Sequence, residues 1–109
     1  MKFKFTYKKK NFELEVEEYR TIFSKFRGLM FGKNSKPLLF VFGKPTRQAI
    51  HSFFCKPFIA VWFNGINIVD VKSVNKWVFW IQPKGKFDKL LEIPSESSFF
   101  KIFLDEAKV

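Results

Sequence analysis

The sequence has few of the residues that cross-link small domains or hold metal ions. Among its 109 residues there is one cysteine, Cys55, and one histidine, His51. A single cysteine cannot form a disulfide within the chain, and one cysteine with one histidine is too few for the four ligands of a structural zinc site. We therefore expect no metal centre, no redox chemistry and no cofactor.

Long hydrophobic runs are also missing. No stretch of the sequence approaches the roughly 18 to 20 apolar residues that a membrane-spanning helix needs. The first ten residues, MKFKFTYKKK, interleave lysines with aromatic residues and lack the continuous apolar segment of a secretory signal. We therefore expect a cytoplasmic protein that does not bind a membrane. The length fits a single domain, residues 1–109, with one core.

Acidic residues are half as frequent as basic ones, 10 against 20, so the formal net charge is +10. Such an excess is typical of proteins that bind nucleic acid weakly and nonspecifically, because lysines and arginines that neutralise phosphates release counterions. We favour a solvated basic surface instead, since the lysines are spread along the chain and biased nucleotide composition also enriches lysine. Trp62, Trp77 and Trp80 could stack on bases, but such aromatic residues more often fill a core.

The N-terminal segment predicts a β-hairpin. Residues 2–7 and 12–17 each alternate apolar and charged side chains with the period of two that is typical of half-buried strands. A turn falls at Lys8-Lys9-Lys10 between them. Pairing brings the lysine face of the first strand beside the glutamate face of the second, and opposite charges across strands stabilise a sheet by about 0.2 to 1 kcal/mol each.

The period changes after the hairpin, and this change predicts a short helix. From Glu18 onward, apolar side chains fall on one helical stripe: Tyr19, Ile22, Phe23, Phe26 and Met30. Gly28 can adopt the left-handed conformation that ends a helix.

The rest of the chain predicts strands. Apolar runs occupy residues 38–43, 49–54, 58–64, 66–74, 77–81, 89–94 and 99–104, and Asn64-Gly65 is a strong hairpin signal between two of them. The predicted fold is an α+β domain that is mainly antiparallel β. About eight strands form a small curled sheet or barrel-like domain, and one short helix follows the first hairpin.

Four short motifs occur in a familiar order. RGLM at residues 27–30, LLFVFG, HSFF followed by FIAVWFN, and LLEIP resemble, in order and spacing, the bacterial and archaeal family of unknown function called DUF192. The similarity extends from about residue 19 to residue 94, and His51 matches the histidine of archaeal-type members. Ala60 departs from the pattern, because the family usually has an aspartate there. The resemblance implies a fold and candidate positions, since the activity of the family is unknown.

Four residues are candidates for a ligand-binding site: Arg27, Gly28, His51 and Glu92. The guanidinium of Arg27 offers a planar fork for a carboxylate or phosphate, and the following glycine lets a ligand approach the backbone. The alternative for Arg27 is an ion pair with Glu92 that fastens helix to sheet, although a lone glutamate in an apolar strand often points outward. The alternative for His51 is a hydrogen-bonded structural histidine.

The sequence contains no convincing catalytic constellation. On a straight strand His51 and Cys55 lie about 13 Å apart, at 3.3 Å per residue, so they do not form a catalytic pair. We expect a small non-enzymatic domain, monomeric or weakly dimeric, that binds a small molecule or a protein near the Arg-Gly-Leu-Met corner. The alternative is a nonspecific nucleic-acid-binding protein that uses its basic surface.

Overall fold

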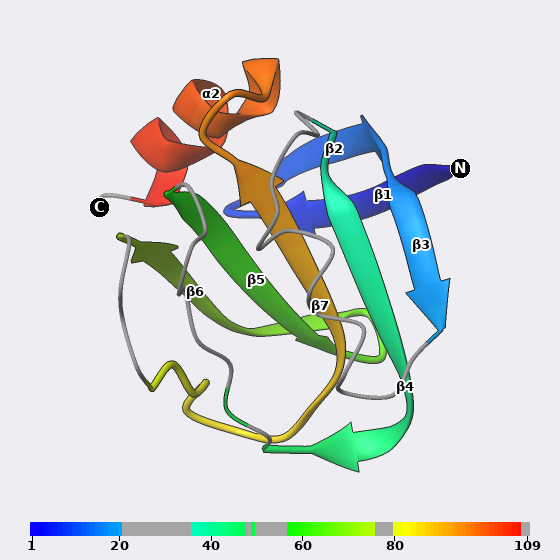
Figure 1. Cartoon of the computed structure of the whole chain (residues 1–109). Helices are drawn as coiled ribbons and strands as arrows, with labels where there is room; N and C mark the ends of the chain where they lie inside the picture. The colour runs from blue at the N-terminus through cyan, green and yellow to red at the C-terminus, as the bar shows by residue number, and fades with distance from the viewer. Residues whose placement is uncertain (21–35, 48, 50–56, 76–79, 108–109) are drawn as a thin grey trace.

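The computed structural model of the chain describes residues 1–20, 36–47, 49, 57–75 and 80–107. These residues contain seven strands and one helix: β1 (Lys2–Tyr7), β2 (Lys10–Glu15), β3 (Glu17–Arg20), β4 (Leu38–Thr46), β5 (Phe58–Asn64), β6 (Asn67–Val74), β7 (Phe87–Pro94) and α2 (Ser98–Ala107). Strands β1 and β2 form one sheet, and the other five form a sheet in the order β3-β4-β7-β5-β6 (Figure 1).

The predicted N-terminal hairpin is confirmed. β1 pairs antiparallel with β2, and the turn between them places Lys8 and Lys9 at positive φ angles of 50° and 66°. The lysine and glutamate faces meet as expected, because Lys4 lies opposite Glu13 with Nζ and Oε2 3.8 Å apart. Both side chains are substantially exposed, so this ion pair adds little stability.

The Asn64-Gly65 hairpin is also confirmed. Gly65 has a φ of 63°, which a glycine adopts without strain, and β5 runs antiparallel to β6. The register shifts between Trp62, opposite Asp70, and Phe63, opposite Ile68, so one extra residue of β6 bulges out. This bulge explains why apolar and polar residues alternate imperfectly along β6.

The five-stranded sheet is built around β7. This strand lies between β4 and β5 and is antiparallel to both, whereas β3 runs parallel to β4 at one edge. Residues from Leu90 to Pro94 are all buried, because β7 has a neighbour on each side and packed residues on both faces. Within the described residues the sheet stays open, with β3 and β6 as its edges, rather than closing into a barrel.

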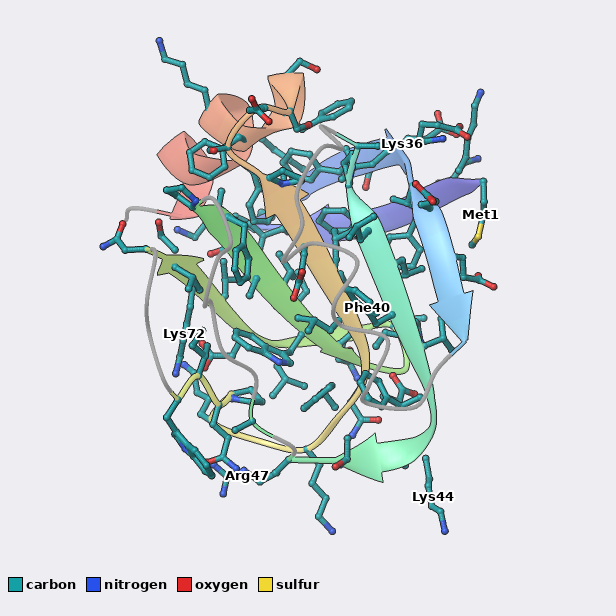
Figure 2. All side chains as sticks on the ribbon, in the orientation of Figure 1. Met1, Lys36, Phe40, Lys44, Arg47 and Lys72 are labelled. Atoms are coloured by element: carbon teal, nitrogen blue, oxygen red, sulfur yellow. The ribbon has the colours of Figure 1, made fainter. Side chains whose placement is uncertain are left out.

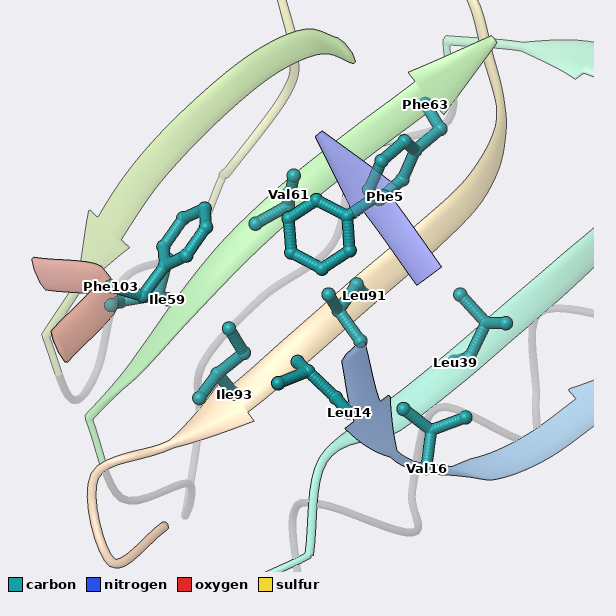
Figure 3. Packing of buried hydrophobic residues seen from close by; sticks show 10 residues of the cluster. All are labelled: Phe5, Leu14, Val16, Leu39, Ile59, Val61, Phe63, Leu91, Ile93 and Phe103. Atoms are coloured by element: carbon teal, nitrogen blue, oxygen red, sulfur yellow. The ribbon is translucent and has the colours of Figure 1, made fainter. Parts of the chain in front are cut away.

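Two layers of apolar side chains lie on opposite faces of this sheet. On one face, the β1–β2 hairpin and α2 cover side chains from β4, β5 and β7 (Figure 3), giving a core of Phe5, Leu14, Val16, Leu39, Ile59, Val61, Phe63, Leu91, Ile93 and Phe103. On the other face, which we call the Glu92 face, the buried apolar side chains are Leu38, Phe40, Phe58, Ala60, Trp62, Val74, Ile81, Phe87 and Leu90.

Two predictions of secondary structure are wrong. Glu18 to Arg20 belong to the strand β3 instead of beginning a helix, because β3 pairs with β4; residues 21–30 lie outside the described residues. The run 99–104 forms part of α2 instead of a strand. The Ser97 hydroxyl accepts a hydrogen bond from the amide of Phe99 at 3.2 Å and so caps the helix, whose Phe99 and Phe103 pack against the sheet.

The three tryptophans do not share one environment. Trp62 is fully buried, as the core interpretation predicts, whereas Trp80 is 70% exposed, so that interpretation is wrong for Trp80. Trp77 and most of the runs 49–54 and 77–81 lie outside the described residues. Among the helices of the described part of the chain, none is long and apolar enough to cross a bilayer.

Candidate functional site

A row of directly opposed residues crosses the sheet at Glu92. On β7, Glu92 lies opposite Leu38 of β4 on one side and Ala60 of β5 on the other, and Ala60 lies opposite Lys72 of β6. Leu38 and Ala60 both belong to the Glu92 face. Because directly opposed residues point to the same side of a sheet, the Glu92 carboxyl also points to this face, away from the hairpin and α2.

The Glu92 carboxyl is buried and has no partner among the residues that the structure describes. Its residue is 4% exposed, and it forms no hydrogen bond or ion pair with any residue that the structure describes. Burial away from water disfavours the charged form and raises the pKa of Glu92 from its ordinary value of 4.5 to about 8. At pH 7 the group is therefore mainly a neutral carboxylic acid, which can donate one hydrogen bond as well as accept others.

A buried polar group without an acceptor lies on the same face. Trp62 is fully buried, and its Nε1–H has no acceptor among the described residues. Trp62 lies two residues beyond Ala60 on β5, opposite Leu90, which makes it a diagonal neighbour of Glu92. Diagonal neighbours lie about 7–8 Å apart in a sheet, within reach of long and aromatic side chains. The Glu92 face thus carries two buried hydrogen-bond donors on neighbouring strands.

Lys72 lies at the margin of this group. Its Nζ is 6.0 Å from the centre of the Trp62 ring and donates a hydrogen bond of 2.5 Å to the carbonyl oxygen of Gln82. Its side chain remains 44% exposed, so its charge reaches solvent beside the buried indole.

Of the predicted site residues, the structure places only Glu92. Arg27, Gly28 and His51, like Cys55, lie outside the described residues, so their role stays a prediction. Ala60, where the resemblance leads one to expect an aspartate, is directly opposite Glu92. Trp62 is the residue that reasoning from the sequence missed as part of a site. Its position in an apolar run signalled burial, but nothing local showed that its N–H lacks an acceptor.

A cavity lies on the opposite face of the sheet. It is a groove of about 940 Å³ between the β1–β2 hairpin and the β5–β6 turn, lined by Phe3, Lys4, Phe5, Thr6, Asn11, Phe12, Glu13, Phe63, Gly65, Ile66 and Lys89. Polar side chains that line the groove form hydrogen bonds and ion pairs with one another. Thr6 donates to the side chain of Asn11 at 2.8 Å, and Lys4 pairs with Glu13.

The charge on the far side of the groove is paired as well, since Lys89 Nζ lies 3.3 Å from the Asp88 carboxylate. The groove therefore offers apolar surface, whereas the Glu92 face holds polar groups that lack partners among the described residues. Among the described residues, no group of three or more histidine, cysteine, aspartate and glutamate side chains could hold a metal ion.

Comparison with known proteins identifies the fold alone. No protein-family model and no curated protein matches the sequence. A solved structure of a protein of unknown function from Novosphingobium aromaticivorans is similar, with a TM-score of 0.71 and 16% identity over 84% of this chain and 70% of that one. A second, from Sinorhizobium meliloti and described as "a putative transcription regulator", has a TM-score of 0.69 and 17% identity over 84% of this chain and 76% of that one.

Proposed function

We propose that this chain is a binding domain of the DUF192 type, without enzymatic activity, that holds the acceptor oxygens of a small ligand on the Glu92 face. The observation that supports the proposal is the buried carboxyl of Glu92, which has no partner among the described residues and lies diagonal to the unsatisfied N–H of Trp62. Leaving a buried donor without an acceptor costs about 1–3 kcal/mol, so a ligand that satisfies both donors is strongly favoured.

The chemistry of the two donors selects the class of ligand. A protonated carboxyl and an indole N–H both donate, so they fit a carbonyl, carboxylate or phosphate oxygen better than an ammonium group. A neutral acid kept protonated by its apolar surroundings is an established way to bind a negatively charged oxygen. The net charge of +10 also attracts anions to the protein. Small carboxylates and phosphates are therefore the favoured ligands.

Titration against pH tests the proposal, because only the protonated form of Glu92 can donate. We would measure thermal stabilisation and calorimetric binding with acetate, succinate and inorganic phosphate between pH 6 and 10. Affinity should fall about tenfold per unit above the pKa of Glu92. Glu92→Gln keeps an N–H donor that does not titrate, so its affinity should stay level across this range.

Two further variants separate the site from general charge effects. Trp62→Phe removes the N–H and should weaken binding about tenfold. Glu13→Gln, which changes an exposed carboxyl on β2, should bind like the unmodified protein. The proposal is wrong if none of the three anions binds, or if binding persists unchanged at pH 10. Mass spectrometry of small molecules that copurify with the protein from its native source would identify the natural ligand.

A further inference from the structure

We propose that the end of the molecule around Trp80 binds single-stranded nucleic acid, with a base stacked on the indole ring and phosphates held by the cations beside it. We call this region the Trp80 surface and define it by Lys44, Arg47, Lys72, Trp80 and Lys84. It meets the Glu92 face at Lys72 but differs from it, because there the proposed ligand is a small anion and the indole of Trp62 is buried, whereas Trp80 is exposed.

Trp80 is held in place with most of its ring in solvent. It is 70% exposed, and its Nε1 donates a hydrogen bond of 3.4 Å to the side-chain oxygen of Gln82. Gln82 is itself held in place by two hydrogen bonds. Its side-chain amide donates to the backbone carbonyl of Arg47, and its backbone carbonyl accepts from Lys72 Nζ. The bond to Gln82 uses the edge of the indole ring, so the faces remain available for stacking.

The segment that carries Trp80 is tied to the two neighbouring parts of the chain. Arg47 Nη2 donates to the carbonyl of Pro83 at 3.0 Å. The backbone amide of Lys84 donates to Asp70 Oδ2 at 3.1 Å, while Asp70 Oδ1 accepts from the amide of Val71 at 2.8 Å. An exposed aromatic ring fixed by such contacts is preorganised, since its ordering on binding costs little further entropy.

The cations that define this surface are poorly neutralised. Lys44, Arg47 and Lys84 are exposed and form no ion pair with any described residue. Lys72 approaches one carboxylate, that of Asp70, at 4.0 Å, but Asp70 is largely buried and already accepts backbone hydrogen bonds. Figure 2 shows Lys44 and Arg47 at the end of the molecule far from α2 and the hairpin, and Lys72 at one side.

At the hairpin end, several cations form ion pairs with acidic residues. There the N-terminal ammonium and Lys36 both lie near Glu15, at 2.7 Å and 4.0 Å, and Lys4 lies near Glu13. Several cations at the hairpin end are therefore paired with acids, whereas Lys44, Arg47 and Lys84 form no ion pair with a described residue. Unpaired cations attract phosphates with an affinity that depends on salt.

The combination of one exposed ring and several cations fits a single strand. Every base has a π-face that stacks on an aromatic side chain, but in a duplex these faces are already covered by neighbouring bases. A membrane partner fits less well, because binding at an interface relies on several apolar side chains inserted together. Among the described residues, three large hydrophobic side chains are exposed: Met1, Ile66 and Trp80. Of these three, only Trp80 belongs to this surface.

Fluorescence anisotropy with a labelled twelve-residue oligothymidine at low salt tests the inference on the full chain. Trp80→Ala should raise Kd about 5- to 150-fold, the range that loss of one stacked base produces, whereas Trp80→Phe should retain most of the affinity. Lys84→Gln should lower the slope of log K against log salt by about 0.7 for each phosphate contact that is lost.

Lys101→Gln is the matched control, because it removes the same charge from an exposed site on α2 at the other end of the molecule. It should leave Kd and the salt slope nearly unchanged. A duplex of the same length should bind more weakly than the single strand. The inference is overturned if Trp80→Ala binds as tightly as the unmodified protein, if Lys101→Gln and Lys84→Gln lose equally, or if Trp80 mediates binding to phosphatidylserine vesicles while oligothymidine does not bind.

Discussion

Glu92 on β7 lies directly opposite Ala60 on β5, with both residues buried on the face of the sheet that also holds the Trp62 indole. The resemblance to DUF192 leads one to expect an aspartate at position 60, so two carboxyls would face each other across the strands. This chain has one acid in the pair, Glu92, and the small Ala60 side chain lies opposite it. The protonation of Glu92 should therefore affect both the proposed ligand binding and the stability of the sheet.

Stability should fall as the pH rises, because of Glu92. Its pKa is raised to about 8 in the folded protein from an ordinary 4.5, so the folded protein keeps a proton that the unfolded chain releases between these values. At about 1.4 kcal/mol per pKa unit, the free energy of unfolding should drop by as much as about 5 kcal/mol across that window. Denaturant unfolding from pH 4 to pH 9 measures this loss.

Glu92→Gln provides the test of that assignment. The neutral amide should largely abolish the loss of stability between pH 5 and 8, and above pH 8 it should be more stable than the unmodified protein. Glu13→Gln, at an exposed site, should follow the unmodified protein at every pH. If the two variants behave alike, Glu92 does not carry the pH dependence.

Ala60→Asp should introduce a second carboxyl opposite Glu92 and destabilise the protein. The new side chain would lie opposite Glu92 in a fully buried position, and two neighbouring carboxyls cannot both ionise there without a large cost. We expect a loss of more than about 2 kcal/mol at pH 8 and a smaller loss at pH 5, where both acids are protonated. Ala60→Asn has nearly the same volume, so a loss that is equal for both variants at both pH values would show that packing alone is responsible.

Removing the cap of α2 should cost a modest amount of stability. Ser97 accepts the hydrogen bond from the Phe99 amide, and replacement of such a serine by alanine costs about 0.5–2 kcal/mol. The helix buries Phe103 against the hairpin and the sheet, so this loss should appear in the global unfolding midpoint. Ser98→Ala, at an exposed neighbouring position, is the control and should change the midpoint little.

The sequence predicted the local parts of the fold better than the parts that depend on distant pairing. The two hairpins are specified by alternation and by turn residues close in sequence, and both are present. The run 99–104 consists of residues that suit a strand or a buried helix equally, and a single hydrogen bond to Ser97 distinguishes them. Residues 18–20 form a strand only because β4, far along the chain, lies beside them.

The same limit applies to the candidate site. A glutamate in an apolar strand points to solvent if its strand is at an edge, but β7 turns out to be the central strand, so Glu92 is buried. Strand order depends on contacts between distant segments, and no local pattern reports it. The exposure of Trp80 was missed for a similar reason, since its environment depends on hydrogen bonds between Gln82 and residues 10 to 35 positions away.

The last prediction concerns Arg27, for which the sequence and the proposed function lead to different expectations. If Arg27 pairs with Glu92, then Arg27→Ala leaves a buried carboxylate without its partner and costs about 3–5 kcal/mol. Replacing both residues by apolar ones would then recover much of this loss, because no stranded charge remains. The proposed function instead leaves Glu92 available to a ligand, so Arg27→Ala should change the melting temperature little.

A double-mutant cycle on denaturant unfolding at pH 9, where Glu92 would ionise, distinguishes the two expectations. Under the proposed function the effects of Arg27→Ala and Glu92→Leu should add to within about 0.5 kcal/mol. The two single variants should then differ in anion affinity. Glu92→Leu should bind anions more weakly, since it removes a donor from the site, whereas Arg27→Ala should not. A coupling energy of several kcal/mol would instead show that Arg27 fastens Glu92 in place, and the proposed ligand site on the Glu92 face would have to be abandoned.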